Sequence, residues 1–150
     1  MPKHIFTVVV RGQSVDVQTN NITLFSVLEE IGASEVPFAF PDFAVVSLWK
    51  REPGEEGVRF VQRTSLVDPS GKEVFSADIT LGFEKSRQRS IVIMQAAPFA
   101  TTGEYHLVIR IRREGGEEWS LVTDYPLEVR LLRPDKSANL LPTATSSHGS

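Results

Sequence analysis

The sequence contains no cysteine and no long apolar run. The first absence excludes disulfide bonds, thiolate zinc sites and cysteine nucleophiles. No stretch approaches the ~18–20 apolar residues that a helix needs to span a bilayer. The apolar stretch at residues 5–10 is interrupted by Thr7 and is too short for the core of a secretory signal. We therefore expect a cytoplasmic protein of bacterial type.

Strong charge of either sign is also absent. The formal net charge is −3, from 16 Lys and Arg against 19 Asp and Glu. A domain that binds nucleic acid is usually strongly basic, so nucleic acid is not an expected partner. Hydrophobic residues make up 41% of the 150 residues, which is ordinary for a globular protein. A chain of this length can bury a large core, and we expect a single folded domain.

The strictest pattern in the sequence is an alternation that follows Gly103. Its main apolar residues share the odd positions: Tyr105, Leu107, Ile109 and Ile111. A period of two over this length predicts a half-buried β-strand. A tyrosine at the start of such a strand is typical of immunoglobulin-like sandwiches, where the buried ring bonds back to the preceding loop. We therefore expect Tyr105 to be buried, with its hydroxyl bonded to backbone within residues 98–103.

Further strand-like runs, separated by turn signals, continue to about residue 132. They cover residues 4–11, 22–31, 43–50, 58–67, 73–84, 89–96 and 119–131. Two turns are marked clearly, one by Pro69 and Gly71 and the other by the pair Gly115 and Gly116. About eight short strands with such turns predict an all-β fold, an antiparallel immunoglobulin-like β-sandwich. An eight-stranded barrel is the alternative, because strand patterning separates the two poorly.

The pattern ends after Leu132. Residues 133–150 are rich in Pro, Ser, Thr and Ala and have no periodicity, which predicts a disordered tail behind a sandwich domain of residues 1–132. In each predicted strand, the residues at alternate positions are assigned to the core. The predicted core residues are Phe6, Val8, Leu24, Phe43, Val45, Trp49, Phe60, Ile79, Leu81, Ile91, Ile93, Tyr105, Leu107, Ile109, Trp119 and Leu121.

Catalytic chemistry finds little support in the sequence. None of the three histidines has a partner at metal-ligand spacing, so no metal, cofactor or catalytic residue is expected. His106 falls on the polar face of its strand, where Asp124 of the next strand could lie beside it. Such a pair could act as an oriented base. A solvated surface histidine is the favoured interpretation, because no nucleophile can be placed beside it.

The basic residues form two groups. Lys85, Arg87 and Arg89 cluster in one predicted loop. The second group lies on the C-terminal strands and comprises Arg110, Arg112, Arg113, Arg130 and Arg133. Together they could form a positive stripe that meets a phosphate-bearing or acidic partner. Glutamates interleave with the second group, which favours cross-strand pairing on a solvated face.

One resemblance adds to this interpretation. Residues 20–29 fit the pattern Asn-x-hydrophobic-x-hydrophobic-Phe-x-hydrophobic-hydrophobic-Glu, and a proline-bearing loop follows. With the turn at residues 68–72 and the segment Gly103-Glu104-Tyr105, residues 4–132 resemble a family of small uncharacterised bacterial immunoglobulin-like β-sandwich proteins, a domain of unknown function. The resemblance implies the sandwich fold. It implies no activity, and no functional residue is transferred from it.

Two functions from different classes remain open. A sandwich presents loops and open edges on a rigid scaffold, which favours a non-enzymatic binding or protein-interaction module. Its partner would be another protein, or a second copy of the chain through an exposed sheet edge, with no membrane involved. The alternative is a small enzyme or ligand carrier with a loop-built site near His106 and Asp124.

Overall fold

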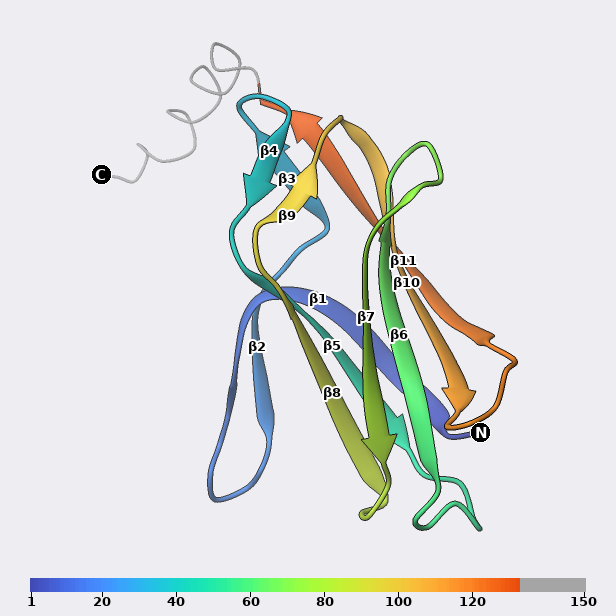
Figure 1. Cartoon of the computed structure of the whole chain (residues 1–150). Helices are drawn as coiled ribbons and strands as arrows, with labels where there is room; N and C mark the ends of the chain where they lie inside the picture. The colour runs from blue at the N-terminus through green and yellow to red at the C-terminus, as the bar shows by residue number, and fades with distance from the viewer. Residues whose placement is uncertain (133–150) are drawn as a thin grey trace.

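The computed structural model describes residues 1–132 as eleven β-strands in two sheets and a short ribbon (Figure 1). Sheet A contains, in spatial order, β2 (Ile22–Val27), β1 (Lys3–Val15), β5 (Phe43–Lys50) and β8 (Arg87–Met94). Sheet B contains β3 (Glu30–Ala33), β11 (Ser120–Leu131), β10 (Gly103–Arg113), β6 (Arg59–Val67) and β7 (Glu73–Gly82). The ribbon pairs β4 (Phe38–Phe40) with β9 (Ala97–Phe99). The expected tail, residues 133–150, lies outside the described residues.

The main core lies between the two sheets. Val45 and Trp49 of sheet A and Leu107 and Ile109 of sheet B are all buried in one hydrophobic cluster. In the part of the chain that the structure describes, no strand ladder joins sheet A to sheet B. The all-β sandwich predicted from the sequence is therefore confirmed, and its sheets stay open rather than closing into a barrel.

Three short strands were not expected. The run at residues 22–31 is two strands, because the chain leaves sheet A after Val27 and β3 then pairs in parallel with β11 of sheet B. The segments expected as loops before β5 and before β10 contain β4 and β9, which pair with each other. Strands of three or four residues are too short to show a period of two, so the sequence pattern cannot reveal them.

Tyr105 lies where the sequence predicted. Its side chain is buried, and the hydroxyl donates a hydrogen bond to the carbonyl oxygen of Thr101 at 2.9 Å. The same oxygen accepts a longer bond from the Thr101 amide at 3.3 Å. The ring also packs edge-on against Phe99, with the ring centroids 4.9 Å apart. The loop before β10 is thus anchored to the core by one side chain.

Removing that hydroxyl should have a measurable cost. We expect Tyr105→Phe to lower the free energy of unfolding by about 1 kcal/mol, the usual net value of one such hydrogen bond. The ring and its packing stay in place, so the change isolates the bond to Thr101. Urea unfolding followed by tryptophan fluorescence measures it. An unchanged midpoint would mean that the hydroxyl does not stabilise the loop.

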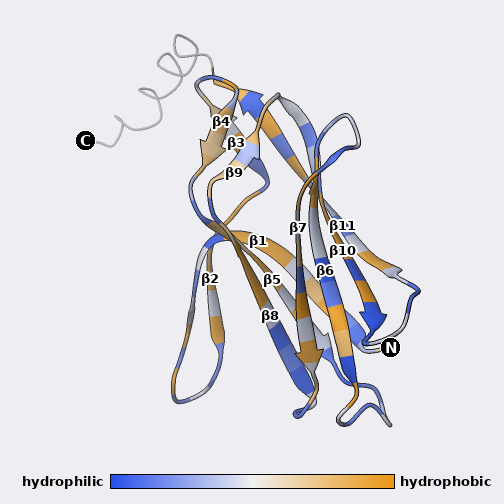
Figure 2. Ribbon diagram, viewed as in Figure 1, coloured by the Kyte–Doolittle hydropathy of each residue, from blue (hydrophilic) through white to orange (hydrophobic). Residues whose placement is uncertain are grey.

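The predicted core needs one correction on β8. Val92 and Met94 face the main core, whereas Ile91 is half-buried on the opposite face and Ile93 is 54% exposed there. Residues 91–94 are apolar at every position, so their pattern could not decide which parity points inward. Figure 2 shows this strand changing from hydrophilic at its start to hydrophobic along the rest.

Other predicted core residues also lie elsewhere. Phe6, Val8 and Leu24 pack into a second hydrophobic cluster, built around Val10, Ala44 and Val46 on the outer face of sheet A. Ile79 is half-buried at the margin of the main core. The remaining predicted residues that lie outside the core are Leu121, which is exposed, and Trp119.

Trp119 is half-buried outside the sandwich. The guanidinium groups of Arg63 and Arg112 lie 4.4 and 4.7 Å from its ring centroid. Attraction between guanidinium groups and the aromatic face stabilises the indole there without burial in the core. The alternation of apolar residues along positions 119–131 assigned Trp119 to the core, and this prediction was wrong.

Candidate binding groove on the outer face of sheet A

The outer face of sheet A changes from apolar to basic along its strands. Register places side chains of β1, β5 and β8 in rows across the sheet. The rows are Val10 with Ala44 and Ile93, Val8 with Val46 and Ile91, Phe6 with Leu48 and Arg89, and Lys3 with Lys50 and Arg87. The first two rows are apolar, the third is mixed, and the fourth consists of three cations.

The cationic row has no neutralising partner in the described chain. Lys50 stands directly opposite Lys3 on one side and Arg87 on the other. Directly opposite side chains in antiparallel strands have Cβ atoms about 4.5–5.5 Å apart, and like charges at that distance destabilise the sheet. Within residues 1–132, none of the three forms an ion pair. The fold therefore maintains a concentration of positive charge at some cost in stability.

Two more cations lie next to this row. Lys85 belongs to the turn between β7 and β8, and Arg89 lies one row further along β8. Arg89 donates from Nη2 to the carbonyl oxygen of Asn20 at 2.8 Å. Its Nε is buried and has no hydrogen-bond acceptor among the described residues. Arg89 thus holds the hairpin tip with one nitrogen and keeps another buried without a partner in the described chain.

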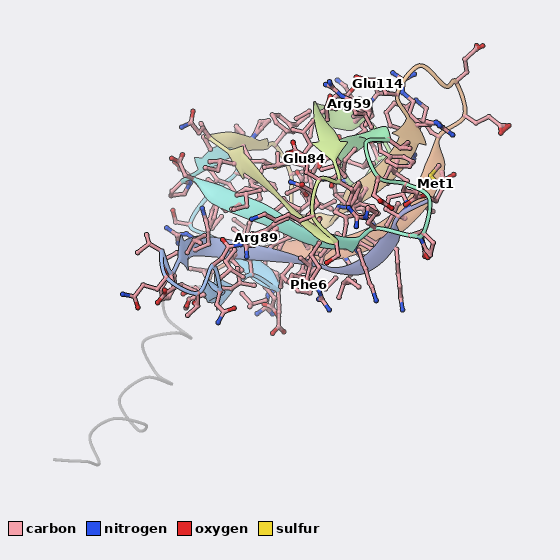
Figure 3. All side chains as sticks on the ribbon, turned by 90° about the horizontal axis from the view of Figure 1, so that it is seen from below. Met1, Phe6, Arg59, Glu84, Arg89 and Glu114 are labelled. Carbon is pink, nitrogen blue, oxygen red and sulfur yellow. The ribbon has the colours of Figure 1, made fainter. Side chains whose placement is uncertain are left out.

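The hairpin of β1 and β2 covers part of the apolar rows. The second half of β1 pairs with β2, so that Ile22 and Leu24 pack against the second hydrophobic cluster. The bond between Arg89 and Asn20 joins the tip of this hairpin to β8, which is the opposite edge of sheet A. Figure 3 shows that Phe6 and Arg89 lie on one side of the molecule, and Arg59 and Glu114 on the other.

The hairpin tip is shaped by Asp16. Its Oδ1 accepts hydrogen bonds from the backbone amides of Gln18 at 2.8 Å and Thr19 at 2.9 Å. These amides, with that of Thr19 first, hold the pKa of the Asp16 carboxyl below its usual value. Asn20 follows in the left-handed conformation, with φ of 60°, which asparagine tolerates better than most residues. This turn directs the backbone carbonyl of Asn20 toward Arg89.

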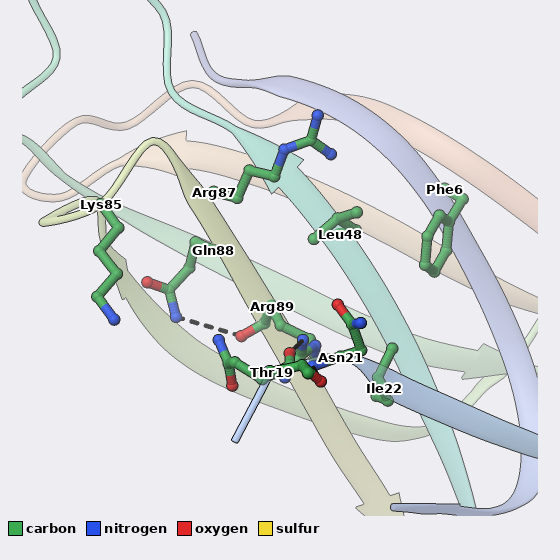
Figure 4. A pocket seen from close by; sticks show the side chains of 10 residues that line it. Phe6, Thr19, Asn21, Ile22, Leu48, Lys85, Arg87, Gln88 and Arg89 are labelled. Atoms are coloured by element: carbon green, nitrogen blue, oxygen red, sulfur yellow. Dashed lines mark hydrogen bonds between the residues drawn. The ribbon is translucent and has the colours of Figure 1, made fainter. Parts of the chain in front are cut away.

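A groove of about 690 Å³ lies between the hairpin tip and β8 (Figure 4). Its apolar lining comes from Phe6, Ile22 and Leu48. Its polar and charged lining comes from Thr19, Asn20, Asn21, Lys85, Arg87, Gln88 and Arg89. Lys3 and Lys50 extend the positive charge from Arg87 across the sheet. The groove thus combines cations, amide groups and an apolar patch, and no acidic residue lines it.

The sequence identified part of this site. Lys85, Arg87 and Arg89 form the basic group that was predicted in one loop, but Arg87 and Arg89 lie on β8, because this strand begins two residues earlier than its pattern indicated. Lys3 and Lys50 were missed, because they approach Arg87 only through pairing between distant strands. The sequence did contain one signal for Lys50. This lysine shares alternate positions with Val46 and Leu48 along the strand, so all three side chains lie on the same face.

Two residues of the second basic group, Arg112 and Arg130, are engaged within the protein. Arg130 forms an ion pair with Glu30 at 2.6 Å. Arg112 stacks on Trp119 and donates from Nη1 to the carbonyl oxygen of Gly116. Arg133 of this group lies outside the described residues. These contacts fit the solvated face that was favoured for the group.

His106 and Asp124 lie side by side, as the alternative function required. Nδ1 of His106 is 2.5 Å from Oδ1 of Asp124, and Glu104 approaches the other ring nitrogen at 3.7 Å. The pair is open to solvent, with His106 35% exposed and Asp124 50% exposed. Among residues 1–132, no serine or threonine hydroxyl is hydrogen bonded to His106. The geometry is that of a solvent-exposed hydrogen-bonded pair.

Two further properties concern the whole described chain. Residues 1–132 contain no group of three or more His, Asp or Glu side chains arranged to hold a metal ion. In the same part of the chain, no helix is long and apolar enough to cross a membrane.

Comparison with known proteins identifies a family and a fold. The model of DUF6941, a family of unknown function, matches residues 10–130. No curated protein matches the sequence significantly. A solved structure, the C-terminal domain of Wzt, is similar with a TM-score of 0.55 and 8% sequence identity, covering 88% of this chain and 75% of that one. At this identity the similarity concerns the fold alone.

Proposed function

The chain belongs to this family of unknown function, and we propose that it is a non-enzymatic protein-interaction module whose groove binds an acidic segment of a partner protein. The observation that carries the proposal is the row of Lys3, Lys50 and Arg87. Three like charges in adjacent strands destabilise the free protein. Carboxylates of a bound segment would relieve that repulsion.

The rest of the groove favours a peptide over a simple anion. Asn20, Asn21 and Gln88 supply amide groups that can both donate to and accept from a peptide backbone. Phe6, Ile22 and Leu48 supply an apolar surface that an inorganic anion would not use. An acidic segment with one large apolar side chain satisfies all three kinds of lining.

Nucleic acid fits the molecule less well. The whole chain carries a net charge of −3, which opposes the long-range attraction of a polyphosphate. The cationic row of Lys3, Lys50 and Arg87 is confined to one end of the outer face of sheet A. A local contact of a few carboxylates matches this distribution better than a track of phosphates.

The open His106–Asp124 pair favours this proposal over the enzymatic alternative. An enzymatic site would need a nucleophile or a bound group within reach and some exclusion of water. The exposure of both side chains favours a solvated pair instead. Alanine at either position should change the free energy of unfolding by less than about 0.5 kcal/mol, as for most surface substitutions.

Charge reversal in the cationic row tests the function. The probe is a fluorescein-labelled peptide with two glutamates on each side of one phenylalanine, and binding is measured by fluorescence anisotropy. We expect the double variant Lys50→Glu, Arg87→Glu to bind roughly tenfold more weakly or worse, a loss of at least about 1.4 kcal/mol. Binding to the unchanged protein should also weaken with salt, because the Debye length falls from about 10 Å at 0.1 M to about 3 Å at 1 M.

The control for a charge reversal outside the groove is Lys72→Glu, at an exposed position in the turn before β7. It should leave peptide affinity within about twofold of the unchanged protein, since it lies outside the groove. The double variant should keep its thermal stability, because it turns the repulsion between positions 3 and 50 into an attraction and exchanges the repulsion between positions 50 and 87 for a similar one of opposite sign. Equal binding by the double variant and the control would contradict the proposal. Displacement of the peptide by phosphate alone would contradict the role of the apolar lining.

A further inference from the structure

β7 is the longest open edge strand in the described chain. It pairs with β6 on one side only and ends the strand order of sheet B. From Phe75 to Gly82 this pairing continues without a register shift. The strand contains no proline, lysine or arginine, the residues with which proteins commonly prevent edge pairing. Its outer backbone is therefore a template for another strand.

The other edges are shorter or interrupted. β3 has four residues. β2 has six, and Ser26 within it adopts a positive φ of 54°. β8 carries Arg87 and Arg89 along its first half. β7 is long, regular and free of lysine and arginine. Each of the other three edge strands of the two sheets lacks at least one of these properties.

The two faces of β7 differ in a way that suits addition of a strand. Phe75, Ala77 and Ile79 point inward and are only half-buried, because the sandwich ends at this edge. On the outer face, Asp78 forms two hydrogen bonds with Arg63, at 2.8 and 2.9 Å. These bonds hold the pKa of Asp78 below its usual value and neutralise its charge locally. Between Phe75 and Gly82 the edge thus carries no uncompensated charge.

We propose that β7 pairs antiparallel with β7 of a second copy of this chain, with the two-fold axis at Ala77. In an antiparallel pair, residues directly opposite each other have their side chains on the same face of the sheet. A two-fold axis between two identical strands must therefore pass between two copies of the same residue. Only Ala77 and Asp78 lie close enough to the middle of the strand to give full overlap. An axis at Asp78 would place two carboxylates directly opposite each other, which is unfavourable.

The register about Ala77 has self-complementary contacts. Phe75 of each copy meets Ile79 of the other, so both half-buried side chains become covered. Ser76 meets Asp78, so no like charges face each other within the regular part of the strand. The small side chain of Ala77 allows the strands to approach at the axis. A closed two-fold pair also removes both open edges at once.

The test uses the chain of residues 1–150, which contains no cysteine, so that any cysteine introduced for cross-linking is unique. Light scattering after size-exclusion chromatography should show a dimer whose fraction rises with concentration. Ala77→Lys should abolish it by placing two ammonium groups at the axis, while Thr23→Lys, at an exposed position of β2, should not. Circular dichroism checks that both variants keep their β-structure.

Cross-linking fixes the register independently of any charge effect. Under mild oxidation, Ala77→Cys should form a disulfide-linked dimer at least roughly tenfold faster than Val17→Cys, because directly opposite positions bring the two sulfurs within bonding geometry. Val17 is 97% exposed and so serves as the reference for random collision. A chain that stays monomeric at every concentration overturns the proposal. A dimer that persists in Ala77→Lys, or equal cross-linking rates, also overturns it.

Discussion

Replacing Gln62 with alanine is expected to lower the free energy of unfolding by about 2–5 kcal/mol. Gln62 lies on β6 and is fully buried between the sheets. Its Oε1 accepts hydrogen bonds from Trp49 Nε1 at 2.9 Å and from Ser90 Oγ at 2.8 Å. Alanine would leave both donors buried without an acceptor, and each orphaned group costs about 1–3 kcal/mol. The cavity left by the side chain adds to this loss.

The same substitution should also weaken peptide binding. Trp49 precedes Lys50 on β5, and Ser90 follows Arg89 on β8. Neighbouring side chains on a strand point to opposite faces, so the network on the inner face holds the strands whose outer side chains form the groove. Loosening β8 would misplace Arg87 and Arg89. Chemical unfolding measures the first effect, and anisotropy with the acidic peptide measures the second.

Thr64→Val provides the matched control. Thr64 is buried on the same strand and receives a hydrogen bond from Gln62 Nε2 at 3.1 Å. Valine has nearly the same shape and removes only that bond, so we expect a loss of about 1 kcal/mol with unchanged peptide affinity. A similar loss in both variants would mean that the bonds from Trp49 and Ser90 contribute little.

The sequence predicted features whose cause is local. The turn at residues 68–72 has Gly71 at a φ of 91°, and the backbone amide of Gly71 donates to the carbonyl of Asp68 at 2.9 Å. The alternation after Gly103 placed Tyr105, Leu107 and Ile109 correctly in the core. In each case the residues that determine the structure are close in the chain, so their pattern contains the necessary information.

Features that depend on pairing between distant segments were not predicted. The groove requires Lys3, Lys50 and Arg87 to share a row, and a shift of one residue would send a side chain to the other face. The apolar outer face of sheet A also reduced the contrast between its two faces. For that reason Phe6 and Val8, which lie in the second cluster, resembled core residues of the sandwich.

The buried polar network was missed for a related reason. Gln62 stands in a run of mixed polarity, and nothing near it in sequence indicates that Trp49 and Ser90 will meet its side-chain oxygen. Burial of a glutamine is favourable only when its amide is hydrogen bonded. The partners come from two other strands, so the sequence pattern of β6 alone could not reveal the network.

The largest loss of stability is expected from Phe99→Ala, at about 3–5 kcal/mol, the usual range for a buried phenylalanine. Phe99 lies on β9 and is fully buried. Its ring stacks on Phe38 with centroids 5.4 Å apart and meets Tyr105 edge-on at 4.9 Å. It therefore joins the β4–β9 ribbon to the sandwich. Such aromatic pairs add about 0.5–1.5 kcal/mol beyond the burial of their area.

Phe25→Ala is the matched control, because it removes the same side chain from β2, where Phe25 is 50% exposed. We expect it to cost less than about 1 kcal/mol, since half of the ring already contacts water. Thermal and urea unfolding of both variants measure the difference. Equal losses would mean that the ribbon is not held by Phe99. A large loss in Phe99→Ala alone would mean that the contacts of this ring with Phe38 and Tyr105 hold the β4–β9 ribbon against the sandwich.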